Sequence, residues 1–241
     1  MKLFKDKEDF SIYKNYICKL SQQESKNIDL NFEGWKILID ESITKIIEDK
    51  LQMKYLGNGI WATDYDNHCR KMLELFIINN KYATFKWGWN FDFIPIEKNK
   101  KLFYAKNDKQ AKLHIFKVST DFYKNTQNRK KTIVSSLAKE LSSFDKTILE
   151  MKESYINVIN YLLPTIKKYY EKTDSYKKII EDIDNKLTNN YYSFINPEMR
   201  VVKVYIKAFL GNKEGAKMEL ETISFKNEEI KKEYLLYLDN V

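Results

Sequence analysis

Cysteine, proline and glycine are scarce in this sequence, and each shortage excludes a class of protein. The 241 residues include two cysteines, three prolines and six glycines. Cys18 and Cys69 alone cannot form a disulfide framework or a CxxC zinc knuckle. Neither GxGxxG nor GxxxxGKS/T occurs, and no GxSxG elbow is present. Phosphate-cradling loops and the serine hydrolase motif are therefore excluded, and we expect no cofactor.

Histidine and long apolar runs are also rare. To hold zinc, His68 and His114 would have to converge with both cysteines, but His68 and Cys69 are neighbours that point oppositely on a strand. His114 lies in LHIFK, where alternation predicts a partly exposed strand position. The apolar runs are too short for a membrane span, and MKLFKDKEDF places charges where a signal peptide needs apolar residues. We therefore expect a cytoplasmic protein with no membrane partner.

Arginine is scarce although the chain is basic. The net charge is +8, yet arginine occurs only at Arg70, Arg129 and Arg200, while Lys, Asn, Ile and Tyr are abundant, as expected from an AT-rich genome. The run Arg129-Lys130-Lys131 opens an expected helix and is a candidate site for an acidic partner or phosphates; a solvated helix start is the alternative. Arginine is the usual residue for bidentate phosphate contacts, so its scarcity weakens the case for nucleic-acid binding without refuting it. Because the net charge favours that case, nucleic-acid binding by the basic helical half is the second hypothesis for function.

Aromatic residues are abundant, at 15%, and concentrate in the stretch KYATFKWGWNFDFIPI. From Ala83 to Phe93 every odd position is apolar or aromatic, which predicts a strand with one aromatic and one polar face. We expect the aromatic face to be a core wall beneath a helix at Trp35–Leu51; a stacking platform is the alternative. The polar face is the candidate ligand surface, because Gly88 would let a partner approach the backbone. Its side chains are Lys86, Asn90 and Asp92.

Turn signals around this strand predict an antiparallel sheet. Asn58-Gly59 has the chemistry of a type I′ turn, in which both central residues take positive φ. Leu73–Ile78 is predicted to be a strand, and Leu102–Ala105 and Leu113–Val118 offer one or two more. The predicted fold class is therefore α+β, with a mostly antiparallel sheet of about five or six strands covered by helices.

In the second half of the chain the apolar spacing changes from two to between three and four, which predicts helices. We expect an α+β domain over residues 1–125 and an all-α helical domain over residues 126–241. The longest helix should begin near Asp145. Its predicted buried stripe is Ile148, Met151, Tyr155, Val158 or Ile159, Leu162, Ile166 and Tyr169.

Paired carboxylates offer the remaining route to catalysis. Asp64 and Asp66 flank Tyr65, so on an extended chain both carboxylates share one face and could hold a divalent cation. Aspartates are also ordinary turn formers, which is the alternative explanation. A divalent-metal-dependent enzyme is therefore the third hypothesis, and no catalytic residue is assigned.

Four segments, GNGIWATDY, Leu73–Ile78, FDFIP and LHIFK, together resemble an uncharacterised bacterial family of domains of unknown function. The resemblance covers about residues 35–123 and includes no catalytic motif. Members of that family are small α+β proteins from polymorphic-toxin, immunity and defence neighbourhoods. Separately, VVKVYIKAFLGNKEGAKMELETI resembles the turn of a tetratricopeptide-type helical hairpin, and such hairpins generally bind proteins.

The first hypothesis for function is accordingly a non-enzymatic protein-interaction module. A bacterial immunity or defence-associated role, which rests on the resemblance, is its most concrete form. The expected partner is another protein, and the oligomeric state is left open.

Overall fold

The computed structural model of the protein describes residues 34, 38, 42–78, 82–99, 101–119, 141, 146–188, 197–225 and 227–241. These residues form a five-stranded antiparallel sheet, a separate two-stranded sheet and six helices. The α+β fold class is therefore confirmed.

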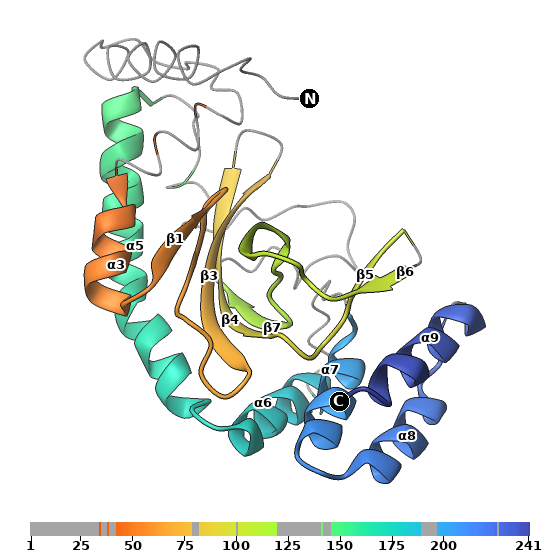
Figure 1. The fold of residues 1–241 in the computed structure, drawn as a ribbon. Coiled ribbons are helices and arrows are strands. Elements are labelled where there is room, and N and C mark those ends of the chain that lie inside the picture. The colour runs from red at the N-terminus through yellow and green to blue at the C-terminus, as the bar shows by residue number, and fades with distance from the viewer. Residues whose placement is uncertain are drawn as a thin grey trace. The chain divides into compact units, whose positions relative to one another are not determined.

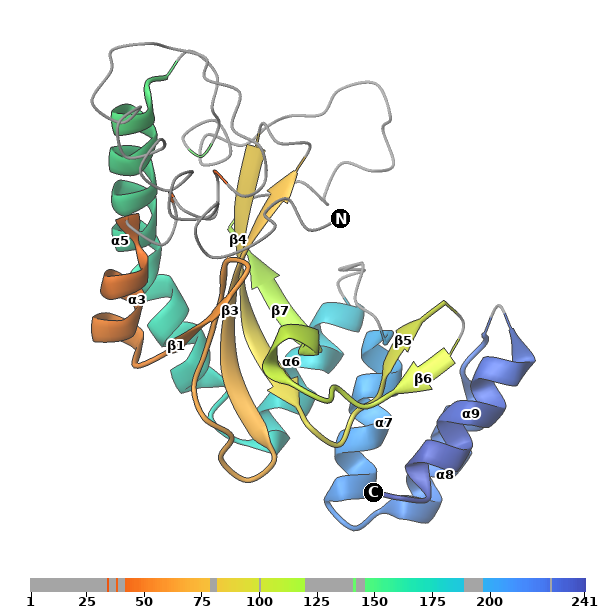
Figure 2. The same ribbon diagram turned by 45° about the horizontal axis from the view of Figure 1, so that its top comes forward.

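The larger sheet has the strand order β1-β2-β3-β4-β7, as Figure 1 shows. Its strands are β1 (Lys54–Gly57), β2 (Ile60–Ala62), β3 (Cys69–Ile78), β4 (Tyr82–Phe91) and β7 (Ile115–Val118). In Figure 2, β3 and β4 are the long strands of this sheet. The smaller sheet pairs β5 (Ile96–Lys98) with β6 (Lys101–Phe103). The sequence predicted one sheet; the structure has two, because β5 and β6 pair with each other.

The turn between β1 and β2 has the predicted geometry. Asn58 and Gly59 both lie in the left-handed region, with φ of 59° and 71°. This confirms the type I′ turn, which requires positive φ at both central residues.

A second turn of the same kind joins β2 to β3. Asp66 and Cys69 exchange two backbone hydrogen bonds, with N–O distances of 2.8 and 3.0 Å. Between them, Asn67 and His68 have φ of 45° and 63°. β3 consequently begins at Cys69, and the prediction that it begins at Leu73 after a longer polar connection is wrong.

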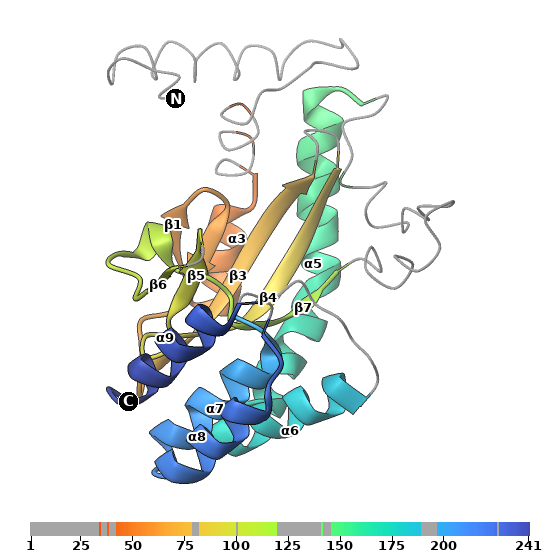
Figure 3. The ribbon, with the colours of Figure 1, turned by 90° about the vertical axis from the view of Figure 1, so that its right-hand side faces the viewer.

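The helices are α3 (Thr44–Leu51), α5 (Ile148–Lys172), α6 (Tyr176–Thr188), α7 (Met199–Phe209), α8 (Lys213–Thr222) and α9 (Glu228–Leu238). α5 continues through Pro164, and every position of its predicted apolar stripe is buried. Figure 3 shows α6, α7, α8 and α9 following one another as a helical group. Gly211, with φ of 93°, ends the α7 region, and the Asn212 side chain accepts a hydrogen bond from the Gly215 N–H to cap α8.

Both faces of β4 are buried from Ala83 to Phe91, so Lys86 and Asn90 of the predicted polar face are buried, whereas Asp92, just beyond the strand, is exposed. Trp89 donates a 2.9 Å hydrogen bond from Nε1 to Thr173 Oγ1, and its ring meets Tyr170 edge-on with centroids 5.5 Å apart. The end of α5 therefore covers Trp89. The predicted cover, the helix at Trp35–Leu51, is wrong for this residue, and α3 instead contacts β1.

The Tyr170 hydroxyl also enters the ladder between β3 and β4. It accepts a 3.1 Å hydrogen bond from the Gly88 N–H and donates a 2.8 Å bond to the Met72 carbonyl. A glycine is required here for a separate reason: a Cβ at position 88 would lie 1.8 Å from the Ile115 carbonyl oxygen. The close backbone approach predicted at Gly88 is thus made by the chain itself.

The described residues group into two compact units. The first contains α3, β1, β2, Leu73–Lys86 and the described part of Val118–Lys167; the second contains Thr63–Met72, Trp87–Lys117 and the described part of Lys168–Val241. Each unit combines segments from both halves of the chain. The predicted domain boundary near residue 125 lies outside the described residues, so the division at that point stays a prediction.

Candidate functional site

Asn90, a candidate ligand-binding residue, lies inside the second unit and is 1% exposed. Its Oδ1 accepts hydrogen bonds from Arg70 Nε at 3.0 Å and from the Tyr65 hydroxyl at 2.6 Å. Its Nδ2 donates to the Lys112 carbonyl at 2.8 Å. Arg70 also binds Asp108, with 2.7 Å between Nη1 and Oδ1. The Asn90 amide therefore organises an internal polar network.

The other two residues of the predicted polar face have different surroundings. Lys86 is buried in the first unit, where its Nζ lies 3.6 Å from the centroid of the Phe76 ring and 3.9 Å from Glu74 Oε2. Asp92 follows β4 and is exposed. Of the three side chains, only Asp92 is available at the surface.

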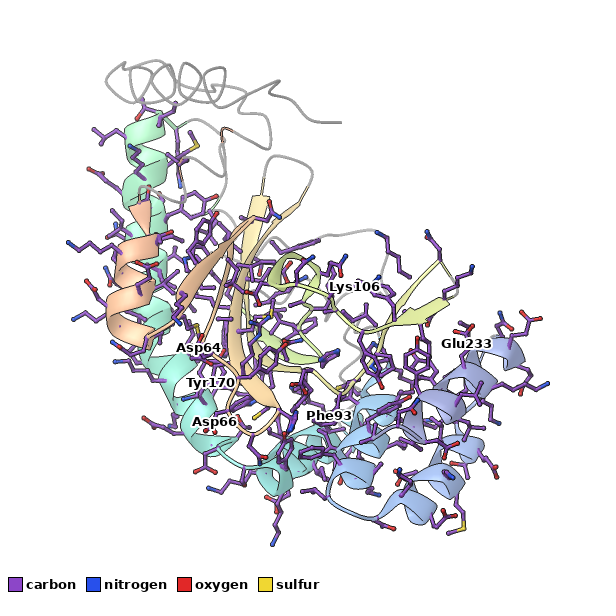
Figure 4. All side chains as sticks on the ribbon, in the orientation of Figure 1. Asp64, Asp66, Phe93, Lys106, Tyr170 and Glu233 are labelled. Atoms are coloured by element: carbon purple, nitrogen blue, oxygen red, sulfur yellow. The ribbon has the colours of Figure 1, made fainter. Side chains whose placement is uncertain are left out.

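The remaining candidate residues either are exposed or lie outside the described residues. Arg129, Lys130 and Lys131 lie outside the described residues. Asp64 and Asp66 are exposed near the turn between β2 and β3, where Figure 4 labels them. Within the part of the chain that the structure describes, no group of three His, Cys, Asp or Glu side chains is placed to hold a metal ion.

A group of rings that the sequence did not predict lies in the second unit. Phe93 stacks on Phe209, with centroids 4.4 Å apart and planes 7° apart. Tyr176 contacts both Phe209 and Phe91, at centroid distances of 5.3 and 6.0 Å. The His68 ring meets Phe209 at 5.3 Å. We call these five residues the aromatic cluster; Phe93 is labelled in Figure 4.

Four separate segments bring the aromatic cluster together: the turn before β3, the end of β4, the start of α6 and the end of α7. Two hydrogen bonds hold the turn in place. The Tyr176 hydroxyl donates to the Asn67 carbonyl at 2.5 Å, and the Asp92 N–H donates to the His68 carbonyl at 3.3 Å. Phe93, Tyr176 and Phe209 remain partly exposed. The cluster is therefore a supported group of rings that reaches the surface.

An exposed histidine–carboxylate pair borders the aromatic cluster. His68 Nδ1 lies 3.0 and 3.1 Å from the two oxygens of Asp92. The histidine occupies the left-handed region at φ 63°, a conformation in which histidine is more common than most residues. This pair supplies charge and hydrogen-bonding groups at the edge of the rings.

Cys69 and Tyr176 are two titratable groups at the cluster whose pKa values are raised. Burial raises the pKa of the Cys69 thiol, whose Sγ donates to the Asp66 carbonyl at 3.3 Å. Burial, together with the nearby Cys69, also raises the pKa of Tyr176. Both groups are therefore kept protonated near neutral pH, which disfavours a nucleophilic thiolate or phenolate.

His114, predicted to be partly exposed, is instead 1% exposed, so that prediction is wrong. Its Nδ1 accepts a 3.0 Å hydrogen bond from the Phe91 N–H. Burial lowers the pKa of His114 to about 3, which keeps the imidazole neutral. This histidine therefore supports the end of β4 and is not placed to act as a surface acid.

Comparison with known proteins adds no relative: no protein-family model, curated protein or solved structure matches this chain. The two resemblances therefore stay predictions.

None of the described helices is long and apolar enough to cross a membrane. In the sequence, only the FDF run marks the aromatic cluster, because Tyr176 and Phe209 are far from it along the chain.

Proposed function

We propose that this protein is a non-enzymatic protein-interaction module that binds its partner through the aromatic cluster. The observation that carries the proposal is the meeting of five rings from four segments at one place, with Phe93, Tyr176 and Phe209 partly exposed. The resemblance to an immunity and defence family suggests a bacterial partner.

The known chemistry of protein interfaces supports the proposal that the aromatic cluster binds a protein. Binding energy at interfaces is concentrated in a few aromatic or arginine side chains near the centre, surrounded by a polar rim that excludes water. The Phe93–Phe209 stack is the expected anchor, because it combines apolar area with partial exposure. His68 and Asp92 have the exposed, polar character of a rim.

The experiment is a binding titration with the products of neighbouring genes, by calorimetry after co-purification. Phe209→Ala should weaken binding by about 2 kcal/mol, or roughly 30-fold, as expected for a central aromatic residue. Asp92→Lys should weaken it less, because the carboxylate belongs to the rim. Glu181→Lys is the matched control, since it reverses another exposed carboxylate of the second unit, on α6, and should bind as wild type does.

Thermal melts and near-ultraviolet circular dichroism establish that each variant is folded. The proposal is wrong if folded Phe209→Ala and Asp92→Lys bind like wild type. It is also wrong if the chain instead shifts DNA or RNA on a gel with an affinity that falls steeply as salt rises, which is the signature of phosphate contacts.

A further inference from the structure

The outward side of α5 carries a regular seam of exposed residues. Glu153, Asn157, Asn160, Pro164 and Lys167 are all exposed. They are separated by four, three, four and three positions, the spacing that keeps residues on one side of a helix and that forms the contact seam of coiled coils.

The middle of this seam lacks charge. No charged residue occurs from Ser154 to Ile166, although 32% of the chain is charged. Within this stretch, Tyr161 is 71% exposed, the highest value among the exposed large apolar side chains of the described residues. Interface centres are depleted in charged residues and enriched in tyrosine, so this composition is typical of a contact surface.

A backbone acceptor lies at the same place. Proline has no N–H, so the helical hydrogen bond from residue 164 to the Asn160 carbonyl is missing. Asn160 is exposed, and a side-chain amide of another molecule is a donor of the kind that the Asn160 carbonyl has lost. The two asparagines of the seam, Asn157 and Asn160, carry such amides.

The ends of the seam carry opposite charges at equal distances from its centre. Glu153 and Lys167 are each seven residues, or about 10 Å, from Asn160 along the helix. Exposed lysines also follow at Lys168 and Lys172, with Glu171 between them. A second α5 helix laid antiparallel around a two-fold axis at Asn160 would therefore bring each glutamate opposite a lysine. A parallel pairing would bring like charges together.

We propose that the outward face of α5 binds the same face of a second copy of this chain, antiparallel and two-fold symmetric. Asn160 meets its counterpart at the axis, Asn157 lies near Pro164 of the partner subunit, and Tyr161 supplies the apolar contact area. Glu153 pairs with Lys167 of the partner subunit, twice per dimer. Because two-fold interfaces use the same patch on both subunits, a self-complementary charge pattern is the required property.

Exposed ion pairs contribute roughly 0.2–1 kcal/mol each, so they set orientation more than affinity. We therefore expect the contact to be a weak, reversible dimer. It is independent of the aromatic cluster and of the proposed protein partner.

Sedimentation equilibrium of the full chain, over about 1 to 300 µM, tests this proposal. Glu153→Lys and Lys167→Glu should each weaken dimerisation about tenfold, since each change affects two pairs of roughly 0.7 kcal/mol. The double variant Glu153→Lys with Lys167→Glu restores opposite charges and should recover the wild-type constant. Tyr161→Ala should also weaken the dimer, and Glu181→Lys on α6 should leave it unchanged.

All these positions are exposed, and circular dichroism establishes that the variants fold. A wild-type chain that stays monomeric over the whole range overturns the proposal. So does a dimer whose constant is insensitive to both single reversals, or a double variant that dimerises no better than the singles.

Discussion

The Tyr170 hydroxyl can be removed without changing the shape of the side chain, and Tyr170→Phe therefore tests how β3 and β4 are held together in the second unit. The hydroxyl oxygen is the acceptor for the Gly88 N–H at 3.1 Å and the donor to the Met72 carbonyl at 2.8 Å. Tyr170 is fully buried, and burial raises its pKa, so the group stays a neutral hydroxyl. Phenylalanine fills the same space and keeps the edge-on contact with Trp89.

The expected loss of stability follows from the Gly88 N–H and the Met72 carbonyl, which both lose their hydrogen-bond partner. A buried donor or acceptor that loses its partner costs about 1–3 kcal/mol, so two of them cost roughly 2–6 kcal/mol of the free energy of unfolding. The lower figure applies if the strands close enough for a direct bond between Gly88 and Met72. Tyr161→Phe is the matched control, because it removes a hydroxyl from an exposed position of the same helix and should change stability by less than about 0.5 kcal/mol.

The assay is urea unfolding followed by tryptophan fluorescence, combined with hydrogen exchange of the Gly88 amide. Tyr170→Phe should lower the unfolding midpoint and speed exchange of this amide, while Tyr161→Phe should change neither. If wild type and Tyr170→Phe had the same urea midpoint and the same exchange rate at the Gly88 amide, the Tyr170 hydroxyl would not bridge Gly88 and Met72.

Two further predictions concern the same unit. Gly88→Ala should prevent normal folding or cost more than about 3 kcal/mol, because its Cβ would lie 1.8 Å from the Ile115 carbonyl; soluble expression and thermal melting with wild-type stability would contradict the close approach. Burial lowers the pKa of Lys186, despite its 2.8 Å ion pair with Asp182, to about 8. Between pH 8 and 10 the unfolded chain therefore binds more protons at this lysine than the folded chain, and the free energy of unfolding should rise with pH by up to about 1.4 kcal/mol per unit. Urea titrations at several pH values should show this rise in wild type and not in Lys186→Met. Above pH 10 the free energy of unfolding should fall, because the tyrosines of the unfolded chain ionise before buried Tyr170 does.

The local sequence pattern correctly predicted several helices, strands and turns. The apolar stripe of α5 is buried as predicted, because a spacing of three to four residues places side chains on one side of a helix whatever lies opposite. The Asn58-Gly59 turn formed for an equally local reason, since both residues tolerate positive φ. The aromatic alternation likewise identified β4, although its boundaries and its cover did not follow from it.

Only the tertiary structure decided which of these residues reach the surface. Alternation placed Asn90 on a polar face, but Arg70 and Tyr65 satisfy its amide and bury it. His68 and Phe209 meet although 140 positions separate them, and no spacing rule relates residues that far apart. Sequence periodicity describes which side of an element a residue occupies, whereas burial depends on the second element that packs there. In this protein the strand β4 could be predicted from its own residues, whereas the aromatic cluster beyond its end could not.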